Sequence, residues 1–101
     1  MVIYEVNLDV DAALFPGYRT WLEEHVHAMI ALPGFIGAQT FERTDPPPPA
    51  NQRSFCVHYK LGSMADLDRY LREDAARMRA DGQERFAGRF TASRRILIES
   101  D

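Results

Sequence analysis

The sequence contains few of the features that mark secreted or membrane proteins. Cys56 is its one cysteine among 101 residues, so no disulfide can form within the chain and nothing indicates an oxidising compartment. No apolar run is long enough to cross a bilayer, and the first residues lack the basic and apolar stretches of a signal peptide. We therefore expect a cytoplasmic protein with no membrane partner.

The common sequence motifs of metal and catalytic sites are also absent. The chain has no Cys-x-x-Cys or His-x-x-x-His pair, no glycine-rich phosphate loop and no Gly-x-Ser-x-Gly elbow. Cys56 and His58 would share one face of a strand, with Glu5 one strand away, but no further ligand supports a metal. Cys56 also has no clearly placed base that would make it a nucleophile. We predict no metal and no cofactor.

Positive charge is not in excess, and this argues against nucleic acid as a partner. The net charge is −3, so no global basic field attracts phosphates. Arginines nevertheless gather late in the chain, where Arg77, Arg79, Arg85, Arg89, Arg94 and Arg95 accompany only Asp81 and Glu84. We interpret this stretch as a solvated, salt-bridged helix face, with an anion site as the alternative.

What the sequence does have is the composition of one globular domain, which we assign to residues 1–101. Hydrophobic residues make up 46% of it and charged residues 27%, a balance that excludes disorder. A domain of this length buries a modest fraction of its surface, so apolar surface is left for a partner to cover. The simplest such partner is a second copy of the chain.

Apolar periodicity predicts four strands. Residues 2–10 alternate strictly between apolar side chains and a second set with polar members at its centre, which is typical of a half-buried strand. Further strands are expected over residues 35–43, 54–61 and 91–99. The prolines at 46–49 cannot donate to a sheet ladder, so they indicate a stiff loop between the second and third strands. A rigid spacer is our interpretation of this loop, with a recognition motif or an active-site lid as the alternatives.

Two helices are expected between these strands. The first has Pro16 in its first turn, is preceded by a short turn over residues 11–15, and ends at Pro33 and Gly34. Its apolar stripe contains Trp21, a predicted core anchor, and His25, which we interpret as a hydrogen-bonded core residue. The second helix begins at Ser63, and residues 83–87 are expected to form a separate turn because glycines flank them.

The order β-α-β-β-α-β predicts an α+β, ferredoxin-like sandwich. In this topology both helices cover one face of a four-stranded antiparallel sheet. The first and third strands lie in the middle, the fourth lies beside the first, and the other sheet face is bare.

Several segments of the chain resemble an uncharacterised bacterial family, the domain of unknown function 4286. The segments are IYEVNL at 3–8, WLEEHV at 21–26, LPGF at 32–35, LDRYL at 67–71, MRA at 78–80 and ASRR at 92–95. The resemblance implies a dimeric α/β-barrel fold, in which two ferredoxin-like units stack their bare sheet faces. It implies no activity, although the family is similar in fold to small monooxygenases and stress-response barrels. Pro16-Gly17 and the loop at 46–49 depart from the family pattern.

The bare sheet face carries the candidate site. Glu5 and Asn7 project from the first strand and His58 from the third, beside Cys56 and Lys60. On the fourth strand, Ile96 and Ile98 are expected to face the core, which would place Arg95 rather than Arg94 on the bare face. Glu5, Asn7, His58 and Arg95 are therefore the candidate ligand-binding residues. Glu5, His58 and Arg95 are the candidates for acid–base catalysis. The alternative is that Glu5 and Arg95 form a cross-strand ion pair within a polar dimer interface.

Three functions fit these features. The first is a homodimeric barrel that binds or transforms a small molecule between the stacked sheets. The second is a non-enzymatic dimer in which the polar residues only specify pairing. The third is an interaction module that holds a partner through the proline loop or the arginine-rich stretch. The sequence does not decide whether the protein is an enzyme.

Overall fold

Four antiparallel strands form one sheet in the order β2-β3-β1-β4 in the computed structural model, which describes all 101 residues. The strands are β1 (Val2–Asp11), β2 (Phe35–Glu42), β3 (Gln52–Leu61) and β4 (Phe90–Ile98). As predicted, β1 and β3 are central and β4 lies beside β1.

The register follows from the alternation of β1. Val2, Tyr4, Leu8 and Val10 are buried against the helices, so the side chains between them point to the other face. Residues 2–10 of β1 are paired on both sides, and Glu5 lies opposite His58 on β3 and Arg95 on β4.

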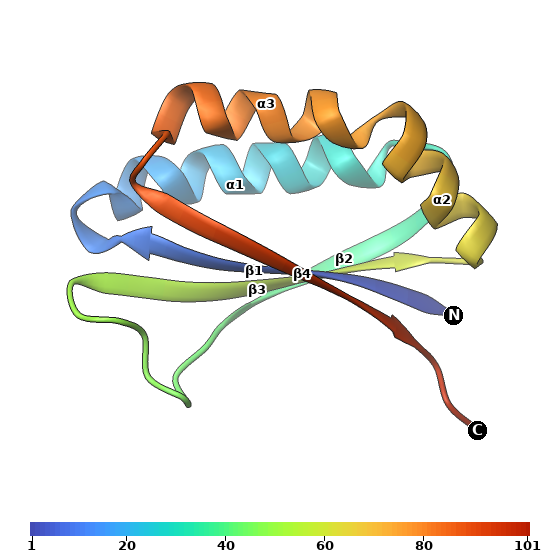
Figure 1. Cartoon of the computed structure of the whole chain (residues 1–101), viewed down its shortest axis with the longest axis horizontal. Helices are drawn as coiled ribbons and strands as arrows, with labels where there is room; N and C mark the ends of the chain where they lie inside the picture. Colours follow the sequence, from blue (N-terminus) through green and yellow to red (C-terminus); the bar gives the residue numbers. More distant parts are fainter.

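The helices cover one face of this sheet and leave the other uncovered (Figure 1). They are α1 (Phe15–Ile30), α2 (Met64–Glu73) and α3 (Ala75–Phe86), and a short 3-10 helix, η1 (Ala12–Leu14), precedes α1. The prediction of two helices is therefore corrected to three. The second helical region changes direction at Asp74, whose φ of −123° departs from helical geometry.

Two helix starts agree with the sequence. Pro16 lies in the first turn of α1, where its missing N–H leaves no helical bond unmade, and η1 occupies the short turn expected before it. Ser63 caps α2, because its Oγ accepts a hydrogen bond from the N–H of Asp66 at 3.2 Å.

The separate turn expected over residues 83–87 is wrong, because α3 continues through Gly82 to Phe86. Gly82 is buried at a contact with Trp21, and a Cβ placed on it would lie 2.9 Å from Cη2 of that ring. Glycine therefore serves this helix as a close-approach point and not as a terminator.

The core lies between the helices and the sheet and contains sixteen buried apolar residues. Trp21 is one of them, as predicted, and its Nε1 donates a hydrogen bond to Asp81 Oδ2 at 2.6 Å. His25 is half-buried and stacks on Trp21 with ring centroids 4.6 Å apart. The hydrogen bond that we expected for His25 is not formed, and aromatic stacking takes its place.

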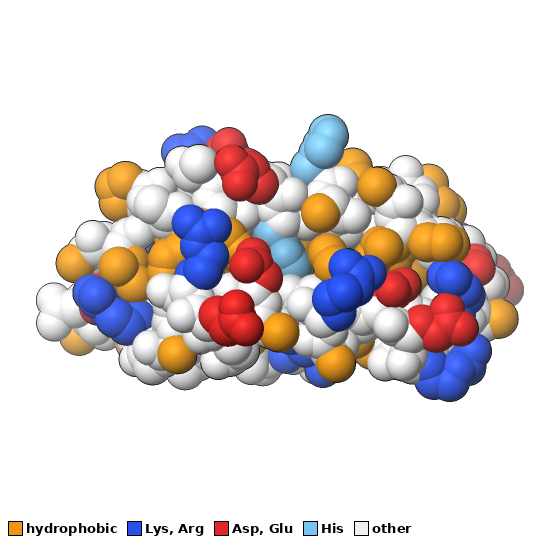
Figure 2. Space-filling model, turned by 90° about the horizontal axis from the view of Figure 1, so that it is seen from above, with side chains coloured by type: hydrophobic (Ala, Val, Ile, Leu, Met, Phe, Trp, Pro, Cys, Tyr) orange, Lys and Arg blue, Asp and Glu red, His pale blue; other side chains and the backbone are white.

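The proline loop extends from the end of the sheet between β2 and β3 (Figure 1). Arg43 holds its first part, since its Nε donates to the carbonyl oxygen of Pro46 at 3.0 Å. No helix of the structure combines the length and the apolar character needed to cross a membrane. Around the helices, basic and acidic side chains are interspersed, with apolar groups between them (Figure 2).

Candidate functional site

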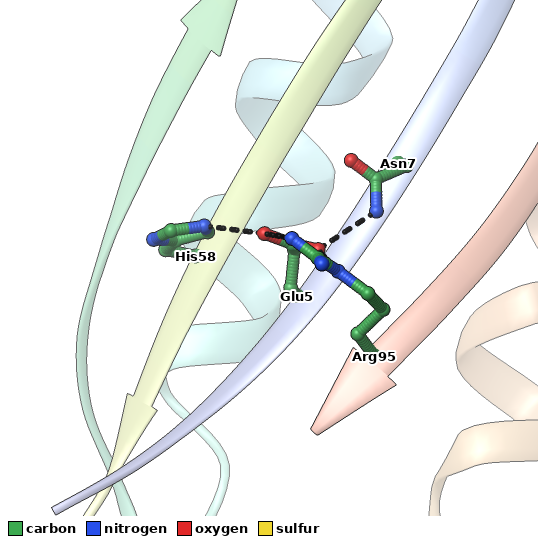
Figure 3. A network of polar contacts seen from close by, with 4 residues as sticks. All are labelled: Glu5, Asn7, His58 and Arg95. Carbon is green, nitrogen blue, oxygen red and sulfur yellow. Dashed lines mark hydrogen bonds and ion pairs between the residues drawn. The ribbon is translucent and has the colours of Figure 1, made fainter. Parts of the chain in front are cut away.

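The four candidate residues of the uncovered sheet face converge on one carboxylate (Figure 3). Glu5 Oε1 is 2.9 Å from His58 Nε2 and accepts a hydrogen bond from Arg95 Nη2 at 3.1 Å. Glu5 Oε2 accepts from Asn7 Nδ2 at 3.0 Å and from Arg95 Nε. The strands β1, β3 and β4 thus assemble these side chains as parity predicts. We call this set the Glu5 network.

The face of each β4 arginine follows from the register. Arg95 is opposite Glu5 and bonds to it, whereas Arg94 is opposite Val6 and turns toward the helices. The structure places Arg95 on the uncovered face, although Ile96 and Ile98, which were expected to face the core, are 46% and 66% exposed.

The environment of Glu5 favours the charged carboxylate strongly. Glu5 is only 3% exposed although no helix covers this face, because the side chain of Arg95 lies across the carboxylate. The hydrogen bond from Arg95 lowers the pKa of Glu5 from 4.5 to about 2, against the opposing effect of burial. Because both carboxylate oxygens are occupied and the group stays ionised near neutral pH, Glu5 is poorly suited to exchange protons with a substrate. The geometry favours a structural role for the network.

Glu5, Cys56 and His58 place three potential metal-ligand atoms within 4.8 Å of one another. This set fits a metal poorly, because the guanidinium of Arg95 already occupies the Glu5 carboxylate. Burial, followed by the charge of Glu5, raises the pKa of Cys56 to about 11, so the thiolate that a metal requires is disfavoured. We therefore do not assign a metal to these three residues.

A second polar contact on the same face was missed from the sequence. Ser54 Oγ donates to Asp9 Oδ1, and Arg43 lies 3.8 Å from the same oxygen. Asp9 shares the parity of Glu5 and Asn7, which is the signal that would have identified it. Phe41 on β2 packs edge-on against His58, with ring centroids 5.4 Å apart, and Phe41 remains 46% exposed.

A cavity of about 220 Å³ lies on the opposite side of the sheet, beneath the helices. Six aromatic residues line it, namely Tyr4, Tyr18, Trp21, Tyr59, Tyr70 and Phe90. Its exposed lining residues are Arg79 and Gln83 on α3 and Arg94 on β4, which places the mouth between these two elements. The sequence pattern marked these aromatic residues as core and gave no sign that they enclose a space.

One polar atom at this cavity has no partner. Tyr18 is 1% exposed, and its hydroxyl forms no hydrogen bond. Buried hydroxyl groups are almost always paired, because an unpaired one loses its hydration without compensation. Tyr18 is therefore a donor and acceptor that a bound molecule would satisfy.

The charged residues of the cavity lining are all basic. Arg79 Nη2 donates to the Tyr4 hydroxyl at 2.8 Å. The side chain of Arg94, in contrast, forms neither an ion pair nor a hydrogen bond within the chain. Burial raises the pKa values of Tyr59 and Tyr70, and the charge of Arg94 opposes this rise at both. Arg94 is thus close enough to the aromatic wall to act on it electrostatically.

Solved structures of other proteins share this fold. A protein of Deinococcus radiodurans provisionally assigned as an antibiotic biosynthesis monooxygenase matches with a TM-score of 0.74 and 15% identity, over 100% of this chain and 94% of that one. Rv0793 from Mycobacterium tuberculosis matches with a TM-score of 0.58 and 14% identity, over 100% and 97%. The de novo designed protein Foldit4 matches with a TM-score of 0.64 and 10% identity, over 98% of each chain. At these identities the likeness shows the fold alone.

The comparison with curated proteins found no match. A family model, in contrast, matches residues 1–100, and so spans all the segments on which the resemblance was based. The chain belongs to the family described as domain of unknown function 4286.

Proposed function

We propose that this protein is a homodimer that binds a small aromatic molecule in the cavity between its helices and its sheet. The observation that carries the proposal is the aromatic cavity of about 220 Å³, whose lining residue Tyr18 has a buried hydroxyl without a partner. A mostly apolar cavity with a few polar groups is the usual form of a small-molecule site. Binding is the proposed function, and the monooxygenase assignment of the Deinococcus protein is not extended to this chain, since a designed protein shares the fold.

The proposed ligand site lies on the helix-covered side of the sheet, whereas the sequence suggested the uncovered side. In a site between stacked sheets the Glu5 carboxylate would have to be free for a ligand, but both of its oxygens are already bonded within the chain. We assign the Glu5 network to the dimer interface. Its central ion pair stays satisfied when a second copy covers it, which avoids the high cost of burying an unpaired charge.

The shape of the domain supports pairing through the uncovered face. Its shortest extent is 18 Å, because helices cover only one side of the sheet. The uncovered side displays Phe41, and Ile3 and Leu97 lie opposite each other at its β1–β4 pair. Two such faces stacked about a two-fold axis would place each apolar group against another sheet at about 10 Å separation.

Two substitutions of alanine by leucine test the ligand site. Ala92 and Ala38 are half-buried alanines on the helix-covered face, but only Ala92 lines the cavity. Ala92→Leu fills part of the cavity, and Ala38→Leu serves as the matched control. We expect neutral 2-naphthol to bind the wild type and Ala38→Leu saturably by fluorescence titration, and Ala92→Leu at least about tenfold more weakly, equivalent to 1.4 kcal/mol.

Two results would contradict the proposal. One is that neither 2-naphthol nor any member of a panel of mono- and bicyclic aromatic compounds shifts the melting temperature of the wild type. The other is that Ala92→Leu binds as well as Ala38→Leu, since the bound compound would then lie elsewhere. The non-enzymatic dimer would account for the first result.

A further inference from the structure

We infer that the molecule bound in the cavity is an aromatic anion whose acidic group pairs with Arg94 at the cavity mouth. This inference rests on the proposed cavity site and adds the chemical class of its ligand. It concerns two members of the arginine-rich stretch, Arg79 and Arg94, for which the sequence left an anion site open.

The first step is the charge of the lining. Arg79 and Arg94 are its two formally charged members, and no aspartate or glutamate borders the cavity. Seven other arginines of the chain pair with carboxylates, namely Arg19, Arg43, Arg53, Arg69, Arg77, Arg89 and Arg95. Arg79 and Arg94 form no ion pair, and they favour a positive potential at the cavity mouth. The nearest carboxylates, Asp74 and Asp81, lie outside the lining, where Asp81 accepts the hydrogen bond of Trp21 and Asp74 pairs with Arg77.

The second step is the position of Arg94. Its charge opposes the burial-driven rise of the pKa at Tyr18, Tyr59 and Tyr70, so one guanidinium influences three rings of the wall. A cation next to an apolar cavity is screened less than one in open water, and its attraction for an anion is correspondingly stronger. The planar guanidinium matches a carboxylate with two parallel hydrogen bonds.

The third step is the set of hydrogen-bond donors. The Tyr4 hydroxyl accepts from Arg79 at 2.8 Å and so keeps its own hydrogen for a further acceptor. The Tyr18 hydroxyl has its hydrogen free as well. The cavity thus offers guanidinium and hydroxyl donors without a carboxylate acceptor, a combination that favours a ligand with negatively charged oxygens.

The fourth step is size and shape. A protein cavity of about 150 Å³ holds benzene, and the cavity here measures about 220 Å³. The tilted rings of Tyr4 and Tyr70, with centroids 5.6 Å apart, form part of its wall. A bicyclic aromatic acid, or a substituted monocyclic one, fits both the volume and the flat apolar surfaces.

The experiment compares 2-naphthoate with 2-naphthamide, which has the same rings and no charge. Calorimetric titration at pH 7 and low salt should show the wild type binding 2-naphthoate about tenfold or more tightly than 2-naphthamide. Arg94→Gln should remove most of this difference by weakening 2-naphthoate much more than 2-naphthamide. Arg72→Gln is the matched control, because Arg72 is exposed on α2 and lies outside the cavity lining. Circular dichroism and melting temperature confirm that both variants are folded.

The outcomes separate the inference from the proposed function. Equal affinity of the wild type for the two compounds, or unchanged 2-naphthoate binding by Arg94→Gln, would overturn the anion inference and leave the cavity site standing. Failure of both compounds to bind the wild type would overturn the inference and the cavity site together. A selective loss of 2-naphthoate binding in Arg94→Gln alone supports both.

Discussion

Glu5 combines features that seldom occur together in one carboxylate. It is nearly inaccessible on a face that no helix covers, and three side chains from three strands satisfy its two oxygens. Removing one partner would leave part of a buried charge unsatisfied, which is why such groups depend on their whole network. The stability of the sheet should accordingly follow the ionisation of this residue.

The pH dependence of stability tests this. The pKa of Glu5 is lowered to about 2 in the folded chain from 4.5. A depressed pKa stabilises the folded state fully above the unfolded value, and this contribution is lost as the pH falls from about 4.5 toward 2. We therefore expect Glu5→Gln to lower the free energy of unfolding by about 2–3 kcal/mol at pH 7.

Urea denaturation at pH 7 and pH 2.5, at one protein concentration, measures this difference. Most of the gap between wild type and Glu5→Gln should close at the lower pH. Glu24→Gln is the control, since Glu24 is exposed on α1 and forms no ion pair. A gap of the same size at both pH values would show that lost packing, and not lost charge, explains the effect.

Residue-scale features differ in how well the sequence predicts them. Alternation along β1 was sufficient to place Glu5 and Asn7 on one face, whereas Arg95 was favoured over Arg94 for that face only because Ile96 and Ile98 were expected to face the core. The unpartnered hydroxyl of Tyr18 could not be predicted, because apolar spacing reports burial and says nothing about hydrogen-bond partners. The charge of Arg94 near the aromatic wall was hidden for a similar reason, since it depends on how far a long side chain reaches.

At the scale of elements, the second helical region shows where local sequence rules fail. Gly82 is a helix-weakening residue, which led us to expect a turn after it. The helix continues because Gly82 lies against Trp21, sixty-one positions earlier in the chain. A contact between such distant residues has no local signature, so the sequence could predict the presence of the helix and not its length.

Two glycine substitutions should have opposite effects on stability. In Gly82→Ala the new Cβ meets Cη2 and Cζ2 of Trp21 at 2.9 and 3.1 Å, and this ring is fixed by Asp81 and His25. The clash should outweigh the gain in helix propensity and give a net loss of about 1–2 kcal/mol. In Gly17→Ala the Cβ meets nothing within 4 Å, so α1 should gain up to about 1 kcal/mol.

Chemical denaturation of the two variants beside the wild type gives these values. If Gly82→Ala proved as stable as Gly17→Ala, the Trp21 ring would have to move easily. The close contact between α1 and α3 would then not restrict the residue at position 82.

At the scale of the whole molecule, the sequence predicted the strand order correctly, because each strand carries its own pattern of alternation. The cavity escaped prediction, since it arises from how side chains of six elements fill the space between two layers. The pairing of two copies is a prediction at this scale, and it depends on the uncovered face.

Light scattering tests the assembly. We expect the wild type at micromolar concentration to have about twice the 11.6 kDa mass of one chain. Phe41→Asp introduces a charge beside His58 on the uncovered face and should shift the protein toward the monomer by tenfold or more, about 1.4 kcal/mol.

Leu71→Asp is the control for that shift. Leu71 is 38% exposed and belongs to α2, in the helix layer. A wild type that is monomeric, or an equal shift in both variants, would count against pairing through the uncovered sheet face.

Successive side chains of β1 point to opposite faces of the sheet. Tyr4, Val6 and Leu8 form part of the cavity wall, while Glu5 and Asn7 belong to the polar network on the reverse side. Substitutions at the even-numbered positions of β1 can therefore adapt the cavity to another ligand, while the odd-numbered positions keep the uncovered face intact. Residues on the two faces of this strand can be substituted independently of each other. This makes the domain a suitable starting point for engineering sensors with new ligand specificities.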